Sequence, residues 1–257
     1  MIKFTKQKDI KNSLLLLSFT SVGLTGNFAS SLLINNNNFE NIGFLFSHFL
    51  SPYAGFNPQT GSVLFNGQVY FNEEKKLLLI NFHAGVPHHN RNKFSQELVE
   101  LFQLYTMRGI IIYGGTAKSF MNDEELRNKN VEVYSLTNEA NFDGTKYGIK
   151  NFESLVKLED KKKPLEEIKY LDGIGTAKHL IKFFSKKAVT FHYFFSYSSE
   201  LFDPLAGLVV YNRLSLLLGL GREVVNVPKY SESLVNFLEG VEKNYKIEPI
   251  WRLFLKE

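Results

Sequence analysis

The sequence contains no cysteine among its 257 residues. Without a thiol, the chain can form no disulfide, no thiolate nucleophile and no zinc site with sulfur ligands. These exclusions remove several classes of enzyme, although they do not decide the cellular compartment. Any catalytic or binding chemistry must therefore come from other side chains.

Long hydrophobic runs are also missing. No stretch approaches the roughly 18 apolar residues that a membrane-spanning helix needs. A basic start, KFTKQKDIKN, precedes the apolar run SLLLLSF, but Thr20, Ser21 and Gly23 interrupt that run before it reaches the length of a secretory signal. We therefore expect a soluble intracellular protein without a membrane partner.

Neither charge nor aromatic residues indicate a nucleic-acid partner. The 30 Lys and Arg against 26 Asp and Glu give a net charge of +4, and the lysines are scattered or grouped in short runs such as Lys161–Lys163. A dense basic stripe is absent. Most of the 24 Phe stand in apolar runs such as FLFSHF and FHYFFS. These runs predict buried strands, not platforms for stacking bases.

Two glycine-containing turns stop short of a nucleotide-binding motif. Gly23 and Gly26 lie between a predicted strand and a predicted helix, where backbone N–H groups can bind phosphate. Their G-x-x-G spacing matches neither the dinucleotide fingerprint nor the P-loop. In the second turn, Gly173 and Gly175 are followed by Lys178 at the place of a third glycine. We interpret both segments as tight turns.

No set of residues indicates catalysis, a cofactor or a metal. His83, His88 and His89 are close in the segment HAGVPHH, but no acidic residue lies between Asn81 and Gln96 to complete a metal site. The other histidines are isolated among aromatic residues or lysines: His48, His179 and His192. No serine lies in a nucleophile elbow. We therefore expect a protein that is not an enzyme and has no cofactor.

The pattern of the first half predicts an α/β fold. SLLLLSF predicts a strand, and the apolar spacing of Phe28, Leu32 and Leu33 predicts a helix that stops at Asn35–Asn38. NIGFLFSHF predicts a second strand, so we expect a β-α-β unit with parallel pairing. Asn66–Gly67 between apolar runs predicts a hairpin. A helix in KFSQELVELFQLYTMRG and the strand IIIYGG complete a second β-α-β unit.

The second half continues the same pattern around one interruption. VEVYSL predicts a short strand, and residues 138–163 are polar and aperiodic, which indicates a surface excursion. A helix in LDGIGTAKHLIKFFSKK and the strand AVTFHYFFS follow. Asp203–Pro204 then caps a mostly apolar helix, which we expect to be buried. SESLVNFLEGVEKNY predicts a last amphipathic helix before the tail, residues 248–257.

The order of these segments is itself informative. The first half contains SVGLTGNFASSLL, IGFLFSHFLSPYAGFNP, VYFNEEKKLLLINFHA and the helix before GIIIYGG. The second half contains GIGTAKHL, DPLAGLVVYNRLSLLLGL and IWRLFL. Taken together and in this order, the segments make most of the chain resemble the proteasome assembly chaperone 2 family.

The resemblance implies a non-catalytic chaperone for the proteasome core particle. Such a protein pairs with a related subunit, proteasome assembly chaperone 1, and binds proteasome α subunits in the cytoplasm and nucleus. The implied fold is a single α/β domain over residues 1–257, a mixed-sheet three-layer sandwich of the purine nucleoside phosphorylase type.

The resemblance also points to the tail as a partner-binding segment. Its candidate residues are Trp251, Arg252, Leu253, Phe254, Leu255, Lys256 and Glu257. Chaperones of this class can insert a terminus of the form hydrophobic residue, tyrosine, any residue between α subunits. Here Lys256 stands at the position of the tyrosine. Burying its ammonium group unpaired would cost several kcal/mol, so insertion of this tail is disfavoured.

Two other classes of function stay open. The first is a small-molecule enzyme related to nucleoside phosphorylases, which would bind phosphate at Gly23 and Gly173. It would need arginines near the anion, and all six lie outside both turns in the sequence: Arg91, Arg108, Arg127, Arg213, Arg222 and Arg252. The second is an RNA-binding module, which would need an aromatic and basic motif that the chain lacks.

We predict that the folded body, and not the tail, supplies most of the binding to α subunits. Removing Leu255–Glu257 should leave that affinity largely unchanged, as measured with purified α subunits. By contrast, Trp251→Ala should lower the free energy of unfolding by about 3–5 kcal/mol, because we expect the indole to pack on the protein itself. Loss of binding without loss of stability on removing the last three residues would contradict this prediction.

Overall fold

The computed structural model describes residues 2–57, 62–117, 131–152, 174–187, 189–198 and 203–220. The chain divides into two units, Met1–Gly221 and Arg222–Glu257, and all of these residues belong to the first. The predicted helix in SESLVNFLEGVEKNY and the tail 248–257 lie outside the described residues. The expectation of a single domain over residues 1–257 therefore stays a prediction.

The described elements alternate between strands and helices along much of the chain. The strands are β1 (Ile2–Phe4), β2 (Leu14–Ser18), β3 (Glu40–Leu45), β4 (Ala54–Asn57), β5 (Ser62–Phe65), β6 (Gln68–Asn72), β7 (Leu77–Asn81), β8 (Gly109–Thr116), β9 (Val133–Thr137), β10 (Ile149–Asn151) and β11 (Phe191–Tyr197). The helices are α1 (Thr25–Asn36), α2 (Arg91–Leu104), α5 (Gly175–Lys186) and α6 (Pro204–Leu217), with 3-10 turns η1 (Val22–Leu24), η2 (His88–Asn90) and η3 (Thr145–Tyr147).

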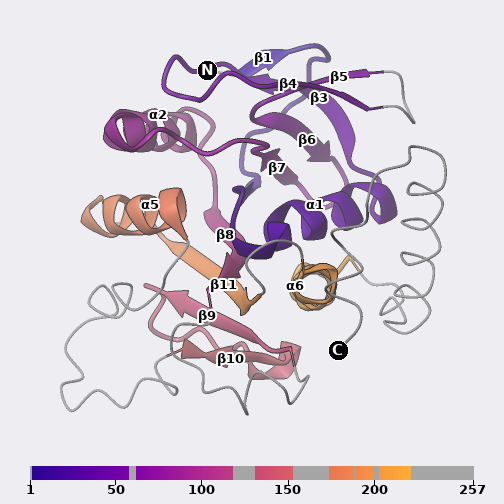
Figure 1. Ribbon diagram of the computed structural model, residues 1–257, viewed down its shortest axis with the longest axis vertical. Helices are drawn as coiled ribbons and strands as arrows, with labels where there is room; N and C mark the ends of the chain where they lie inside the picture. The colour runs from indigo at the N-terminus through magenta and orange to yellow at the C-terminus, as the bar shows by residue number, and fades with distance from the viewer. Residues whose placement is uncertain are drawn as a thin grey trace, which may run out of the picture. The chain divides into compact units, whose positions relative to one another are not determined.

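Nine strands form one mixed sheet in the order β1-β3-β6-β7-β2-β8-β11-β9-β10 (Figure 1). The central strands β7, β2, β8 and β11 run parallel, so their carboxyl ends meet at one edge of the sheet. Helices cover both faces of these strands, which explains why β2 and β8 are almost continuously apolar and buried. Strands β4 and β5 form a separate antiparallel pair.

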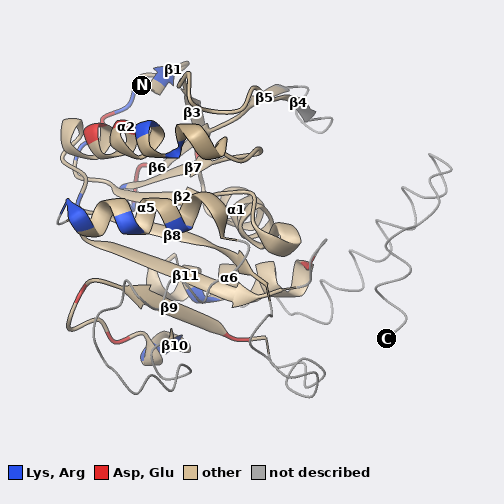
Figure 2. Ribbon diagram, turned by 60° about the vertical axis from the view of Figure 1, so that its left-hand side comes forward, with Lys and Arg blue, Asp and Glu red and all other residues tan. Residues whose placement is uncertain are grey.

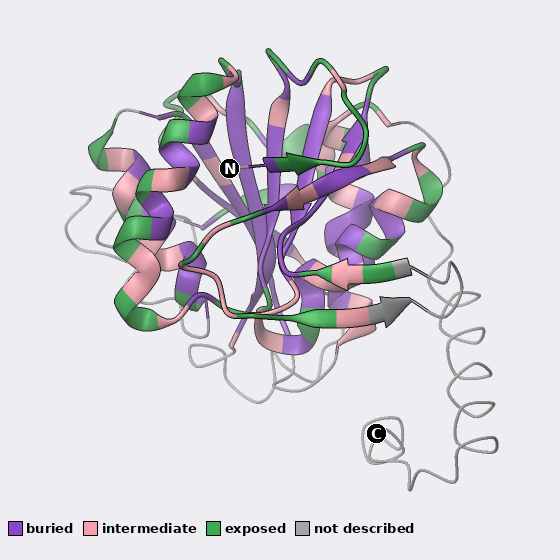
Figure 3. Ribbon diagram, turned by 90° about the horizontal axis from the view of Figure 1, so that it is seen from above, coloured by how far each residue is buried: buried purple, intermediate pink, exposed green. Residues whose placement is uncertain are grey.

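Helices lie on both faces of the sheet. Figure 1 shows α2 and α5 on one face and α1 and α6 on the other. The view from above in Figure 3 shows their buried residues turned toward the sheet. In α2, which confirms the helix predicted in KFSQELVELFQLYTMRG, the apolar residues Phe94, Leu98 and Leu101 form one buried stripe. The expected α/β architecture with a mixed sheet between helices is therefore confirmed for the described residues.

Helix α6 is buried by its own chain. The N-cap is Asp203, whose side chain accepts a hydrogen bond from the Ala206 N–H, with Pro204 at the first helical position, as the sequence predicts. Gly207 lets α6 approach α1, because a Cβ there would lie 2.8 Å from Phe28 Cδ1. No described helix is long and apolar enough to span a membrane.

The first β-α-β unit differs from its prediction. Strands β2 and β3 do not pair, because β7 and β6 lie between them. Strand β6 instead pairs antiparallel with both β3 and β7. The short Glu73–Lys76 turn keeps β7 beside β6, and this local pairing fills the place next to β2. The second unit, β7-α2-β8, is parallel as expected, with β2 between its strands.

The hairpin predicted at Asn66–Gly67 is wrong. Strand β5 pairs with β4, and the turn leads the chain from this small sheet into β6 of the large one. The Asn66 side chain is buried, and its Nδ2 donates to Ser51 O at 3.0 Å and to Ala84 O at 3.3 Å. Its Oδ1 accepts from the N–H groups of His83 and Ala84. Asn66 thus joins three loops by hydrogen bonds, a role that the dipeptide signal does not reveal.

Part of the predicted surface excursion, residues 138–163, belongs to the sheet. Within its described part, 138–152, strand β10 pairs parallel with β9. Ile149 and Phe152 are buried, and the Phe152 ring lies edge-on to Phe195 of β11 at 5.2 Å. The strand has only three residues, too few to show a period in the sequence. Residues 153–163 lie outside the described part.

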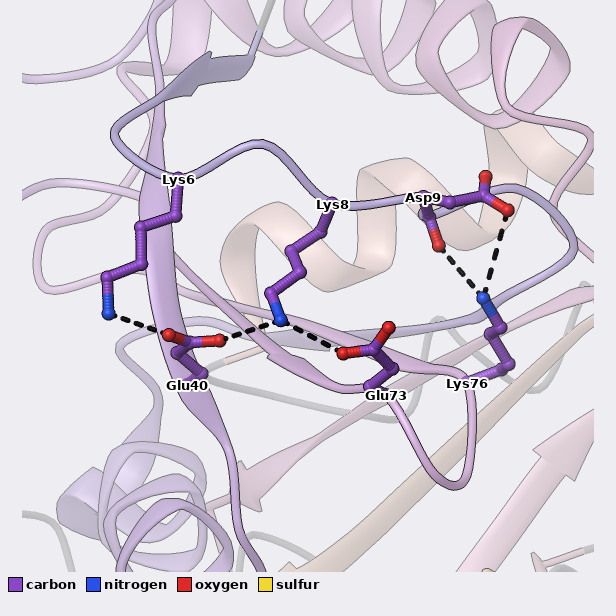
Figure 4. A network of polar contacts seen from close by, with 6 residues as sticks. All are labelled: Lys6, Lys8, Asp9, Glu40, Glu73 and Lys76. Carbon is purple, nitrogen blue, oxygen red and sulfur yellow. Dashed lines mark hydrogen bonds and ion pairs between the residues drawn. The ribbon is translucent and has the colours of Figure 1, made fainter.

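Ion pairs hold the basic N-terminal stretch against the large sheet (Figure 4). Lys8 Nζ lies 3.1 Å from Glu40 and 2.9 Å from Glu73, and Lys6 Nζ lies 2.6 Å from Glu40. Hydrogen bonds from Lys6 and Lys8 lower the pKa of Glu40. These side chains range from partly to largely exposed to solvent, so the pairs position the segment more than they stabilise the fold.

We predict that Asn66→Ala destabilises the protein. The change leaves several partly buried backbone groups without their partner, which should lower the free energy of unfolding by about 1–3 kcal/mol. Denaturant unfolding measures the difference. Asn35→Ala is the matched control, because Asn35 is exposed in α1, and it should leave stability unchanged or slightly higher. Equal stability of both variants would contradict the role assigned to Asn66.

Candidate functional site

The first candidate is the turn between β2 and α1, at the carboxyl edge of the parallel strands. Open α/β sheets usually bind ligands at this edge. Gly23 has a φ of +67° and Leu24 a φ of +51°, both in the left-handed region. Glycine is therefore favoured at position 23 by the backbone conformation alone.

Neighbouring strands and helices approach this turn very closely. A Cβ at Gly115 of β8 would overlap the Val22 carbonyl oxygen and would lie 2.5 Å from Ser198 Oγ. A Cβ at Gly26 would lie 2.8 Å from Ser18 Oγ and 2.9 Å from the carbonyl oxygen of Tyr113. The glycines allow backbone to pack closely against neighbouring groups. This packing supports the interpretation of the segment as a tight turn.

Three backbone donors at the turn are used within the chain. The Gly115 N–H donates to Ser21 Oγ at 2.9 Å, and the Leu24 N–H donates to Ser21 O at 3.0 Å. The Thr25 N–H donates to Val22 O. A phosphate cradle needs such N–H groups to point at the ligand. Here they close a 3-10 turn and attach it to β8 instead.

The acidic N-cap of α6 also lies against the turn. The Asp203 N–H donates to the Gly23 carbonyl oxygen at 2.9 Å, and a Cβ at Gly23 would lie 3.0 Å from the Asp203 Cβ. Ser198 Oγ donates to Val22 O at 2.9 Å. A carboxylate at this position would repel a bound phosphate.

The described arginines make their contacts elsewhere. Arg108 precedes β8, at the opposite end of that strand, and its Nη2 donates to Lys75 O at 3.2 Å. The Arg213 guanidinium packs against Gly148. Arg91 Nη2 lies 3.6 Å from the place of a Cβ at Gly175, the described glycine of the second turn. Arg127, Arg222, Arg252 and Gly173 lie outside the described residues.

The histidines of HAGVPHH lie on different elements. The His83 ring stacks on Tyr53 with a centroid distance of 5.3 Å, and burial lowers the pKa of His83. His88 and His89 lie in η2, before α2. Among the described residues, no group of three or more His, Cys, Asp or Glu has the arrangement of a metal site.

The isolated histidines have structural contacts. His192 Nε2 lies 3.1 Å from Glu139 Oε2, and its ring packs against Phe142 and Phe194. Burial lowers the pKa of His192, and the charge of Glu139 opposes that shift. His179 Nε2 lies 2.6 Å from Asn92 Oδ1, and His48 lies edge-on to the Phe46 ring.

An exposed aromatic surface is the second candidate site. It is formed around β3 and the β4–β5 pair by Phe44, Phe46, Tyr53, Val63 and Phe65. The exposed fraction is 45% for Phe46, 38% for Tyr53, 53% for Val63 and 40% for Phe65. The ring centroids of Phe44 and Phe65 lie 4.7 Å apart. Figure 2 shows the β4–β5 pair extending away from the large sheet. Exposed apolar side chains of this kind are typical of protein interaction sites.

The prediction that FLFSHF is a buried strand is partly wrong, and so the aromatic surface was missed. Strand β3 ends at Leu45, so Phe46 lies beyond the sheet and is exposed. An apolar run does not show where its strand ends. By contrast FHYFFS, in β11, is buried as predicted, apart from the partly buried His192.

The candidate residues of the tail, Trp251 to Glu257, lie outside the described residues. Their assignment as a partner-binding segment therefore stays a prediction.

Comparisons with known proteins point to the same family as the resemblance in the sequence. The model of the PAC2 family matches residues 15–239. The protein named proteasome assembly chaperone 2 from Mus musculus is 26% identical over 125 residues, which are 46% of this chain and 47% of the relative. Its Bos taurus counterpart is 24% identical over the same shares. The alignment thus spans about half the length of these curated relatives.

Solved structures share the fold at low identity. Pyrococcus furiosus PbaA, described as an archaeal homolog of proteasome-assembly chaperone, has a TM-score of 0.69 and 18% identity, covering 95% of this chain and 93% of PbaA. Pyrococcus furiosus PbaB, described as an archaeal proteasome activator, has a TM-score of 0.68 and 15% identity, covering 94% of this chain and 98% of PbaB.

We predict that Gly115→Ala destabilises the fold. The new methyl group would overlap the Val22 carbonyl, so the turn must move, and the free energy of unfolding should fall by about 1–3 kcal/mol. Gly85→Ala is the control, because a Cβ there meets nothing within 4 Å. It should leave stability unchanged or raise it by up to about 1 kcal/mol. Thermal or denaturant unfolding compares the two, and a stable Gly115→Ala variant would contradict the packing role.

Proposed function

The chain belongs to the PAC2 family, and from this premise we propose that it is a non-catalytic chaperone that assists assembly of the proteasome core particle. The family match, which covers most of the chain, carries this proposal. The names of the mammalian relatives and of the archaeal structures support it.

The geometry of the glycine turn favours a chaperone over a phosphorylase-like enzyme. The three-layer sandwich is compatible with a fold of the purine nucleoside phosphorylase type, and we retain that name as part of the proposal. An enzyme of this type would need a phosphate site at the turn after β2. The N–H groups of Leu24, Thr25 and Gly115 are bonded within the chain, and Asp203 adds an acidic group.

The proposed partners are a related chaperone, proteasome assembly chaperone 1, and proteasome α subunits. The aromatic surface supports binding to proteins, because its exposed rings offer apolar area that a partner can bury. Helix α6 is a weaker candidate for the heterodimer contact, because α1 already covers it. The proposed location is the cytoplasm and nucleus, where such partners are assembled.

The test is affinity purification of the tagged full-length protein from a native extract. We predict co-purification of proteasome α subunits together with a related chaperone. Phe46→Ser combined with Val63→Ser should reduce the yield of at least one of them about tenfold, since exposed apolar anchors contribute most at such contacts. Leu104→Ser is the control, because Leu104 of α2 is apolar and 67% exposed but lies outside the aromatic surface.

Two results would contradict the proposed function. One is the absence of α subunits from the purified material of the unchanged protein. The other is phosphate-dependent cleavage of a nucleoside that is lost on changing Gly23 in a protein that remains folded. The second result would restore the enzyme alternative.

A further inference from the structure

Helix α5 has a cationic outer face. Its inner residues, among them Leu180 and Phe184, are buried. Its outer positions carry lysines at 178, 182 and 186, of which Lys182 and Lys186 are exposed. The helix contains no acidic residue. Figure 2 shows Lys and Arg recurring along α5, whereas the neighbouring α2 carries both signs of charge.

A second element adds positive charge to this face. Arg91, the first residue of α2, lies beside the start of α5 at Gly175. The hydrogen bond between His179 and Asn92 joins the two helices at 2.6 Å. Burial, together with the charges of Arg91, His88, Lys182 and Lys186, lowers the pKa of His179. We define the α5 cationic face by five residues: His88, Arg91, Lys178, Lys182 and Lys186.

The fold does not use the exposed lysines of this face. Within the described part of the chain, the ion pairs of lysines lie at the N-terminal stretch, the β6–β7 turn and the β9–β10 pair, and none includes Lys182 or Lys186. Lysines four residues apart on a helix repel one another. The helix dipole favours Lys186 in the last turn, but it does not favour Lys182.

We propose that the α5 cationic face docks an acidic surface of a proteasome α subunit, an inference that rests on the proposed function. Carboxylates placed beside Lys182 and Lys186, which lie about 6 Å apart along the helix axis, would pair with these two exposed lysines and relieve their repulsion. Complementary charge of this kind accelerates association and makes binding salt-dependent. A protein surface is favoured over nucleic acid because the five residues of the face include no Phe, Tyr or Trp ring, the large rings on which bases stack best.

The experiment compares three forms of the full-length protein for binding to purified proteasome α subunits. K182E/K186E reverses the charge of the two exposed lysines of the face. K11E/K146E is the matched control, since it makes the same change in net charge at two exposed lysines outside the face. At about 50 mM salt, K182E/K186E should bind at least about tenfold more weakly than the unchanged protein. The control should bind as the unchanged protein does. Raising the salt to about 200 mM should weaken binding of the unchanged protein several-fold and should affect K182E/K186E less.

Stability measurements separate docking from folding. The melting temperature of K182E/K186E should be unchanged or higher, because the substitutions remove repulsion at exposed positions. K182Q/K186Q, which removes the charge of the two exposed lysines without reversing it, should show an intermediate loss of binding. A melting temperature lowered in both variants and not in the control would assign the lysines to the protein's own stability and overturn the proposal.

The remaining outcomes distinguish the two proposals. Equal binding of α subunits by K182E/K186E and the unchanged protein overturns the docking face and leaves the proposed function standing. If the unchanged protein binds no α subunit at either salt concentration, both fail. Equal loss of binding in K182E/K186E and K11E/K146E would show a net-charge effect and overturn the docking face. A fluorescent single-stranded RNA tests the nucleic-acid alternative. If the unchanged protein binds this RNA and K182E/K186E does not, while K182E/K186E still binds α subunits, the face belongs to a nucleic-acid site and the docking proposal is overturned.

Discussion

The contact of α1 and α6 with the sheet depends on close backbone approach at the carboxyl ends of β2, β8 and β11. Three glycines lack the Cβ that would collide with a neighbouring group. Gly23 lies against Ser198, Gly26 lies against Ser18 and the Tyr113 carbonyl, and Gly115 lies against the Val22 carbonyl and Ser198. Gly207 allows the same approach between the two helices. Because protein interiors are closely packed, a single methyl group at these positions would force the turn to move.

This packing decides what the edge of the sheet can do. In open α/β folds the carboxyl ends of parallel strands commonly hold a ligand. Here the same place holds the N-cap of α6, a 3-10 turn and the hydroxyl groups of Ser21 and Ser198. In this protein the described residues at this place pack against one another and close the turn. This arrangement is compatible with the proposed role of a chaperone that binds other proteins.

The aromatic surface and the α5 cationic face would bind partners by different forces. The aromatic surface offers apolar area, whose burial would supply affinity that depends little on salt. The α5 cationic face offers charge, which would govern the rate and orientation of an encounter. They belong to different elements, β3 with the β4–β5 pair and α5 with the start of α2. One chain could thus contact two partners, or one partner at two places, by different forces.

The elements whose pattern is local could be predicted from the sequence alone. The apolar runs of β2, β8 and β11, the stripe of α2 and the Asp203–Pro204 start of α6 all follow from composition and period. The strand order, the absence of a hairpin at Asn66–Gly67, the exposure of Phe46 and the cationic face completed by Arg91 could not be predicted in this way, because they depend on how the chain folds in space. Pairing and exposure depend on contacts between residues far apart in the chain, and a local pattern carries no record of which distant segment will supply them.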